Sequence, residues 1–265
     1  LPIAPRLYSA LTEAMGDPRI GLTGIAAIVD QDPAIAGRVL QLSNSAWAGL
    51  SRPVGTTWEA LRTLGLDLLR KLVLSAEVFE GFARLGGAPA AELSRLRHHA
   101  VATARIASEL AEAEQAPLAT TAGLLHDIGK LALGIAHPDK WAEAKRRAVE
   151  TEQPIHLMER ELLGCDHADA GAALLDLWGL PLPASQAVAD HHAPERLRPG
   201  ILDVPGLVYA ANILATAAAE GRVWELAKSR RGYDRAWVAC FDDPTLTRWS
   251  AAAERIWMEL EDIAL

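Results

Sequence analysis

Apolar residues recur with the spacing of an α-helix along almost the whole chain, and this pattern leaves little room for a β-sheet. Asp32-Pro33 suits the first turn of a helix, and Ile35 and Val39 then fall on one face. Thr56-Thr57 can cap the next helix, in which leucines recur from Leu61 onward. Alternating runs are missing, as are the Asn-Gly and Asp-Gly pairs of tight hairpins. The pattern predicts an all-α fold.

The distribution of glycine, proline and histidine predicts three parts. Gly86-Gly87-Ala88-Pro89 is the best candidate boundary, because it interrupts two helical runs. No histidine precedes it, and all eight histidines lie between positions 90 and 220. We therefore expect an N-terminal helical subdomain over residues 1–86, a site-bearing helical subdomain over 90–220 and a C-terminal helical extension over 221–265.

The C-terminal extension ends in an amphipathic helix. Trp249, Ala253, Ile256, Trp257 and Leu260 fall on one of its faces. We expect this face to pack on the body of the protein. A partner interface is the alternative interpretation.

Charge and composition disfavour several classes of protein. The net charge is −8, and the only basic clusters, residues 145–147 and 228–231, are interpreted as solvated helix faces, so general nucleic-acid binding is not expected. No apolar run approaches the roughly 18–20 residues that span a bilayer, and no charged-then-apolar leader is visible. Cys165 and Cys240 have no metal or disulfide spacing, which favours free thiols in a reducing compartment. We expect a cytoplasmic protein that does not enter a membrane.

Several histidines stand at predicted helix ends or on apolar helix faces. His99 begins a helical stripe that continues through Thr103, and His167 follows Asp166, a possible helix cap. Helical bundles build metal sites from single ligands on several helices. His98, His137 and His156 are interpreted as ordinary core or surface residues, and Cys165 as a small packed residue. The candidate metal ligands are His99, His126, Asp127, His167, His191 and His192.

These motifs, in this order, resemble the HDOD family, a branch of the HD superfamily found in bacterial signalling. The likeness covers roughly residues 1–215. Its N-terminal pieces are Leu1-Pro2, Asp32-Pro33-Ala34-Ile35, Leu42-Ser43-Asn44-Ser45 and residues 60–66. Its later pieces are residues 99–104, Gly123-Leu124-Leu125-His126-Asp127-Ile128-Gly129-Lys130, residues 163–171, Trp178-Gly179-Leu180-Pro181 and His191-His192.

The resemblance implies a two-lobed helical domain with an HD-type bundle in the second lobe. It also implies an output or interaction module, since many members have lost ligands and have no known activity. The related HD-GYP family keeps its ligands and hydrolyses cyclic di-GMP. Here Asn212 stands where HD enzymes carry a later aspartate, and the Gly-Tyr-Pro segment expected after the double histidine is missing.

These departures favour a signalling module over an enzyme. The expected module retains a metal pocket for Fe, Mn, Zn, Ni or Mg, in which Asn212 is a further candidate ligand, and it acts through a protein partner or a bound nucleotide. The alternative is a metal-dependent phosphohydrolase that acts on cyclic dinucleotides. In that case Asp127 bridges two metal ions and Lys130 contacts a phosphate oxygen. The other interpretation of Lys130 is a cation near a helix C-terminus.

Overall fold

The computed structural model describes residues 5–44, 53–64, 90–177, 180–229 and 233–264. Within these ranges the regular elements are helices and no strand is present, which confirms the all-α prediction. The leucine run after Leu64, the Gly86–Pro89 boundary and Trp178-Gly179 lie outside the described residues. The three-part division at 86, 90 and 220 therefore stays a prediction. None of the described helices combines the length and apolar character that a membrane span requires.

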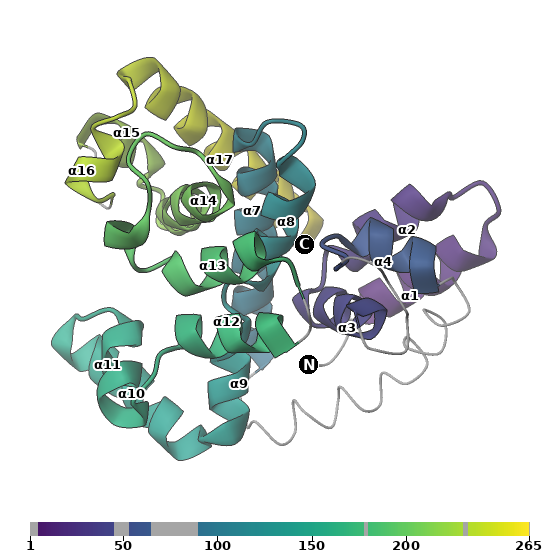
Figure 1. Cartoon of the computed structure of the whole chain (residues 1–265), viewed down its shortest axis with the longest axis horizontal. Helices are drawn as coiled ribbons and strands as arrows, with labels where there is room; N and C mark the ends of the chain where they lie inside the picture. Colours follow the sequence, from purple (N-terminus) through teal and green to yellow (C-terminus); the bar gives the residue numbers. More distant parts are fainter. Residues whose placement is uncertain (1–4, 45–52, 65–89, 178–179, 230–232, 265) are drawn as a thin grey trace.

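Among the residues described before position 90, four helices belong to the N-terminal lobe, which lies on one side of the long helix α7 in Figure 1. Asp32 caps the third of them, because its Oδ1 accepts a hydrogen bond from the Ile35 amide at 3.2 Å. Thr56 caps the fourth through its Oγ1, 3.1 Å from the Glu59 amide. The sequence predicted the helix start at Asp32-Pro33 and the cap at Thr56-Thr57. The four helices are α1 (Pro5–Gly16), α2 (Leu22–Val29), α3 (Pro33–Asn44) and α4 (Thr57–Leu64).

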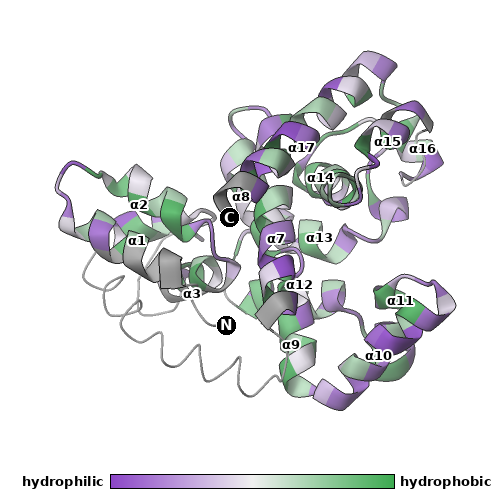
Figure 2. Ribbon diagram, turned by 180° about the vertical axis from the view of Figure 1, so that it is seen from behind, coloured by the Kyte–Doolittle hydropathy of each residue, from purple (hydrophilic) through white to green (hydrophobic). Residues whose placement is uncertain are grey.

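Seven helices follow, and α7 and α8 form the centre of the molecule (Figure 1). Asp166 caps α12 as expected, since its Oδ1 accepts from the Asp169 amide at 2.9 Å. The basic run at 145–147 lies on α10, where each side chain contacts a glutamate, and Figure 2 shows this helix as largely hydrophilic. The helices are α7 (Ala90–Leu110), α8 (Ala116–Leu125), α9 (Ile128–Ala136), α10 (Pro138–Thr151), α11 (Ile155–Leu163), α12 (His167–Leu177) and α13 (Leu182–Asp190).

Helices α14–α16 lie on the other side of α7 and α8 from the N-terminal lobe, and α17 passes along α7 (Figure 1). In the last helix Trp249, Ala253 and Ile256 are buried in the core, so this face packs on the body as expected. Asp203 caps the mostly hydrophobic helix α14, which Figure 2 shows close to end-on. The elements are η2 (Pro194–Arg196), α14 (Val204–Ala219), α15 (Val223–Ser229), α16 (Arg235–Val238) and α17 (Asp243–Ala264).

Two clusters of buried side chains hold these helices together. The first joins α1–α4 to α7, α8, α12, α13 and the start of α14. The second joins the middle of α7 to α14–α17. Helix α7 contributes to both, through Ala100, Val101 and Ala104 in the first cluster and Ala102 and Ile106 in the second.

A glycine lets α9 approach α12 closely. A Cβ atom added at Gly129 would lie 1.9 Å from the His167 carbonyl oxygen and 2.7 Å from the Gly171 amide nitrogen. Both atoms belong to the backbone and cannot turn aside, so only glycine fits at this crossing. The close contact sets the start of α12 beside the turn that carries Asp127.

Candidate metal centre

Four helical segments bring their polar ends to one place in the second lobe. His99 comes from α7, His126 and Asp127 from the turn between α8 and α9, His167 from the first residue of α12, and His191-His192 from the end of α13. The imidazole rings are neighbours, with centroids 5.2 Å apart for His99 and His126 and 5.0 Å apart for His126 and His191. All six predicted ligand positions therefore meet in one cluster.

The carboxylate of Asp127 lies at the centre of this cluster. Its Oδ1 is 3.3 Å from His167 Nε2 and 3.6 Å from His191 Nε2. Its Oδ2 is 3.4 Å from His126 Nε2 and 4.0 Å from His99 Nε2. The potential ligand atoms form two overlapping groups, each with all atoms within 4.8 Å of one another. Asp127 belongs to both groups: one adds His167, His191 and His192, and the other adds His99 and His126.

Two histidines are oriented by the backbone of the helix that precedes them. His126 Nδ1 lies 2.7 Å from the Gly123 carbonyl oxygen, and His191 Nδ1 lies 2.6 Å from the Val188 carbonyl oxygen. A carbonyl can only accept a hydrogen bond, so Nδ1 carries the proton and Nε2 keeps a free lone pair. Both Nε2 atoms therefore face Asp127 in the form that binds a metal ion.

Three of these inward-facing atoms are buried without a hydrogen-bond partner among the described residues: His126 Nε2, His191 Nε2 and Asp127 Oδ1. Unpaired polar atoms in a protein interior are unfavourable and need an explanation, such as an ion. Imidazole Nε2 and carboxylate Oδ1 atoms are both donors to a divalent cation, and each of the two groups contains such unpaired atoms. The residues present therefore fit a metal ion.

His167 is held by an acidic residue that the sequence did not single out. Glu159 on α11 is fully buried, and its Oε2 accepts hydrogen bonds from His167 Nδ1 at 2.5 Å and from the His167 amide at 2.9 Å. Its Oε1 accepts from Trp141 Nε1 at 3.3 Å. A carboxylate behind a ligating histidine fixes the ring and raises its basicity. Glu159 occupies a position at helical spacing from Ile155 and Leu162, where an apolar residue would be usual, and this was the available signal.

His156 also lies at the edge of the cluster, although the sequence gave it no role. Its ring stacks on His192 with centroids 4.3 Å apart and an angle of 16° between the planes. His192 Nε2 in turn lies 3.0 Å from His167 Nε2. Helix α11 therefore supports both His167, through Glu159, and His192, through His156.

Two further predicted residues lie on the Oδ2 side of Asp127. The Lys130 ammonium donates to Oδ2 at 2.7 Å. Asn212 on α14 places its Oδ1 2.9 Å from His99 Nε2. Asn212 is thus beside the cluster, as expected from its position in the sequence. Whether either residue contacts a metal ion or a phosphate stays a prediction.

The electrostatic environment favours the neutral form of His99, His126, His167 and His192 and the charged form of the Asp127 carboxylate. Burial lowers the pKa of His99, His126, His167 and His192, which is the direction that favours the metal-binding form. Burial by itself raises the pKa of Asp127, but the adjacent imidazoles and the Lys130 ammonium outweigh it and hold this pKa well below its usual range. The Asp127 carboxylate is therefore an anionic donor next to imidazoles whose neutral form is favoured.

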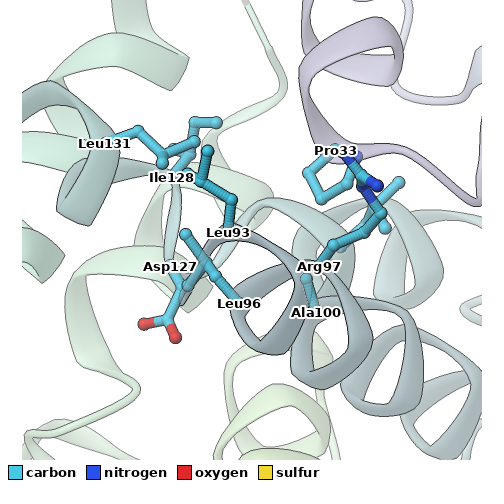
Figure 3. Close-up of a pocket in the computed structure, with 9 residues that line it drawn as sticks. Pro33, Leu93, Leu96, Arg97, Ala100, Asp127, Ile128 and Leu131 are labelled. Carbon is cyan, nitrogen blue, oxygen red and sulfur yellow. The ribbon is translucent and has the colours of Figure 1, made fainter. Parts of the chain in front are cut away.

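The cluster is closed on most sides. His126, His167, His191 and Asp127 are almost fully buried, whereas the side chains of His99 and Lys130 are 21% and 22% exposed. An apolar pocket between α3, α7 and α9 reaches Asp127 from behind. Pro33 and Arg97 line the far side of this pocket, and Figure 3 shows the Asp127 carboxylate oxygens pointing away from them. Solvent therefore reaches the cluster at His99 and Lys130 on one side and at the half-buried His192 on the other.

Several known proteins resemble this chain. An uncharacterised protein of Treponema pallidum (strain Nichols) is 32% identical over 211 residues, which cover 76% of this chain and 40% of that protein. The chain thus spans about two-fifths of the length of the curated relative that it matches.

Solved structures share the fold. The MmoQ response regulator of Methylococcus capsulatus is 26% identical with a TM-score of 0.68, over 95% of this chain and 98% of that one. A protein named as a candidate phosphohydrolase, from Shewanella amazonensis, is 25% identical with a TM-score of 0.52, over 98% and 95%. A Campylobacter jejuni virulence factor, 18% identical, matches in fold alone with a TM-score of 0.70, over 97% and 93%. The sequence model of the HDOD domain matches residues 1–194, so the chain belongs to the HDOD family.

Proposed function

We propose that this chain is a signal-transduction output module of the HDOD type, with a divalent metal centre built on Asp127 in its second lobe. The family and the likeness to a protein named as a response regulator support the signalling role. A protein partner is part of this proposal, because an output module acts through binding. The supporting observation for the metal is the set of inward-facing, unpaired donors around one buried carboxylate.

The donor set favours some metals over others. Imidazole nitrogens suit zinc, iron and nickel, whereas magnesium prefers oxygen donors in an octahedral shell. The cluster offers five imidazoles and one carboxylate, so a transition metal is the better match. An ion held there would tie α7, the α8–α9 turn, α12 and α13 together. At a free metal concentration 100 times the Kd, this binding would stabilise the folded state by about 2.7 kcal/mol.

Metal content tests the proposal directly. The chain is purified without added metal, stripped with a chelator, reconstituted with Zn²⁺ and analysed by atomic emission. We expect close to one equivalent or more in the wild type and a loss of at least tenfold in affinity in His191→Ala. His137→Ala is the matched control, because His137 is exposed at the end of α9 and away from the cluster. Wild-type protein that stays below about a tenth of an equivalent after reconstitution would refute the metal centre.

A second candidate function is metal-dependent phosphoester hydrolysis. It is favoured by the Lys130 ammonium next to Asp127, on a solvent-reached side of the cluster, and by the likeness to the Shewanella amazonensis protein. A bound metal ion would lower the pKa of a water molecule towards neutrality and so supply a nucleophile. In that reaction Asp127 and the histidines orient the site, and Lys130 binds a phosphate oxygen as a point charge.

Hydrolysis of bis(p-nitrophenyl) phosphate and of cyclic di-GMP separates the two functions. With added Mn²⁺ or Fe²⁺, an enzyme should show turnover that disappears in Asp127→Asn and persists in His137→Ala. Equal rates for wild type and Asp127→Asn would leave the signalling module as the function.

A further inference from the structure

The two oxygens of Asp127 face different surroundings. Oδ1 faces His167 Nε2 and His191 Nε2, at 3.3 and 3.6 Å, and it is buried without a hydrogen-bond partner among the described residues. Oδ2 faces His126 and His99, but it already accepts a hydrogen bond from Lys130 Nζ at 2.7 Å. The two sides of the carboxylate are therefore not equivalent toward a cation.

The Oδ2 side also carries a neutral amide, Asn212, in place of any second carboxylate among the described residues. Asn212 Oδ1 lies 2.9 Å from His99 Nε2. Whichever way the amide is turned, this contact engages the nitrogen through which His99 would bind an ion. A metal ion on the Oδ2 side would have to replace both the Lys130 and the Asn212 hydrogen bonds. On the Oδ1 side, Asp127 Oδ1 and His191 Nε2 have no hydrogen bond within the described residues to lose. An ion there would replace the 3.0 Å contact between the neutral His167 and His192 imidazoles, in place of a contact to an ammonium.

Charge points the same way. The buried carboxylates at the cluster are Asp127 and Glu159, and the Lys130 ammonium contacts Asp127. With one divalent ion, the two carboxylates and the Lys130 ammonium leave the site with a net charge of about +1. A second divalent ion would raise this net charge to about +3. Uncompensated charge in a buried site is strongly unfavourable.

We propose that this chain binds a single divalent ion on the Oδ1 side of Asp127, with His167, His191 and His192, and that the Lys130 ammonium takes the place of a second ion on the Oδ2 side. The inference rests on the proposed metal centre and specifies its stoichiometry. Lys130 is thus a built-in cation that neutralises Oδ2. A centre that holds two ions requires removal of this ammonium and a negatively charged side chain at position 212.

A Zn²⁺ titration of the full chain, with the bound metal counted by atomic emission, tests the stoichiometry. We expect one tight equivalent in the wild type. In the double variant Lys130→Met, Asn212→Asp we expect a second equivalent, bound at least tenfold more tightly than any second ion in the wild type. Lys140→Met is the matched control, because Lys140 is exposed on α10, and it should keep one equivalent. Two tight equivalents in the wild type, or only one in a folded double variant, would overturn the inference.

The side on which the single ion binds is tested without the double variant. His191→Ala should weaken the tight equivalent at least tenfold, whereas His99→Ala should weaken it at most about threefold. The reverse order would overturn the inference while leaving the metal centre in place. Wild-type protein that binds no zinc would refute the metal centre itself, so the two failures are distinguishable.

Discussion

Replacement of Glu159 by glutamine should weaken the metal centre without a change of shape. The carboxylate accepts three hydrogen bonds: two from His167, at 2.5 and 2.9 Å, and one from Trp141 Nε1 at 3.3 Å. Burial favours the protonated form, but the hydrogen bonds from His167 hold the pKa of Glu159 below its usual range, so the group is charged at neutral pH. Glutamine keeps one carbonyl oxygen for His167 and turns its amide group toward the Trp141 N–H, where two donors then face each other.

The expected magnitude follows from these contacts. Loss of a carboxylate behind a metal-ligating histidine typically costs about 10- to 100-fold in metal affinity, or about 1.4–2.8 kcal/mol. The conflict with Trp141 leaves a buried donor unpaired and should lower the free energy of unfolding of the apoprotein by about 1–3 kcal/mol. Both effects should appear in Glu159→Gln, because the same side chain makes both sets of contacts.

The affinity is measured at pH 7.5 by competition between the protein and a chromophoric zinc chelator, and the stability by urea unfolding. Glu161→Gln is the control. It lies two residues later on the same helix, its side chain is 59% exposed, and its ion pair with Arg147 should contribute no more than about 1 kcal/mol. If Glu159→Gln binds zinc within twofold of the wild type, Glu159 does not set the orientation of His167, and the reasoning is wrong.

Two further predictions concern the helix crossing at Gly129 and the N-terminal lobe. Gly129→Ala places a Cβ 1.9 Å from a backbone oxygen and should lower the free energy of unfolding in urea by at least about 3 kcal/mol. Gly16→Ala is the control, because its Cβ would meet open space, and it should change this free energy by less than about 1 kcal/mol. Equal effects would contradict the packing argument. Burial raises the pKa of Asp30 to about 6, although the hydrogen bond that Thr57 donates to its carboxylate acts to lower this pKa. The folded state therefore holds this proton more tightly than the unfolded chain, and the stability that Asp30 contributes below about pH 4 is lost as the pH rises through about 6. Asp30→Asn should stabilise the protein at pH 7 by up to about 3 kcal/mol, with a smaller gain at pH 5, and a gain that does not grow between these two pH values would refute the assignment.

Local helical patterns predicted the fold class and the helix positions of single ligands, whereas the resemblance to the HDOD family implied that these ligands meet. The spacing of His99 and Thr103 placed both on one face of α7, and Thr103 is fully buried. The cap at Asp166 fixed the start of α12, so the position of His167 followed from the sequence. In each case a short stretch of chain contains the whole physical reason.

Other features could not be predicted because their reasons lie in tertiary contacts. Glu159 lies where helical periodicity makes an apolar residue usual, but the periodicity does not reveal that His167 and Trp141 donate hydrogen bonds to its carboxylate. His156 acquires a role only when His192 stacks on it. The short helices α15 and α16 contain seven and four residues, too few for a helical period to be recognised.

Helix α7 links the interior of the molecule from end to end. It supplies residues to both hydrophobic clusters and also carries His99 at the edge of the metal centre. Packed interiors transmit displacement instead of absorbing it. A change of coordination that displaces His99 therefore displaces helix α7. This helix packs against the N-terminal lobe through one cluster and against the tryptophan-rich C-terminal helices through the other.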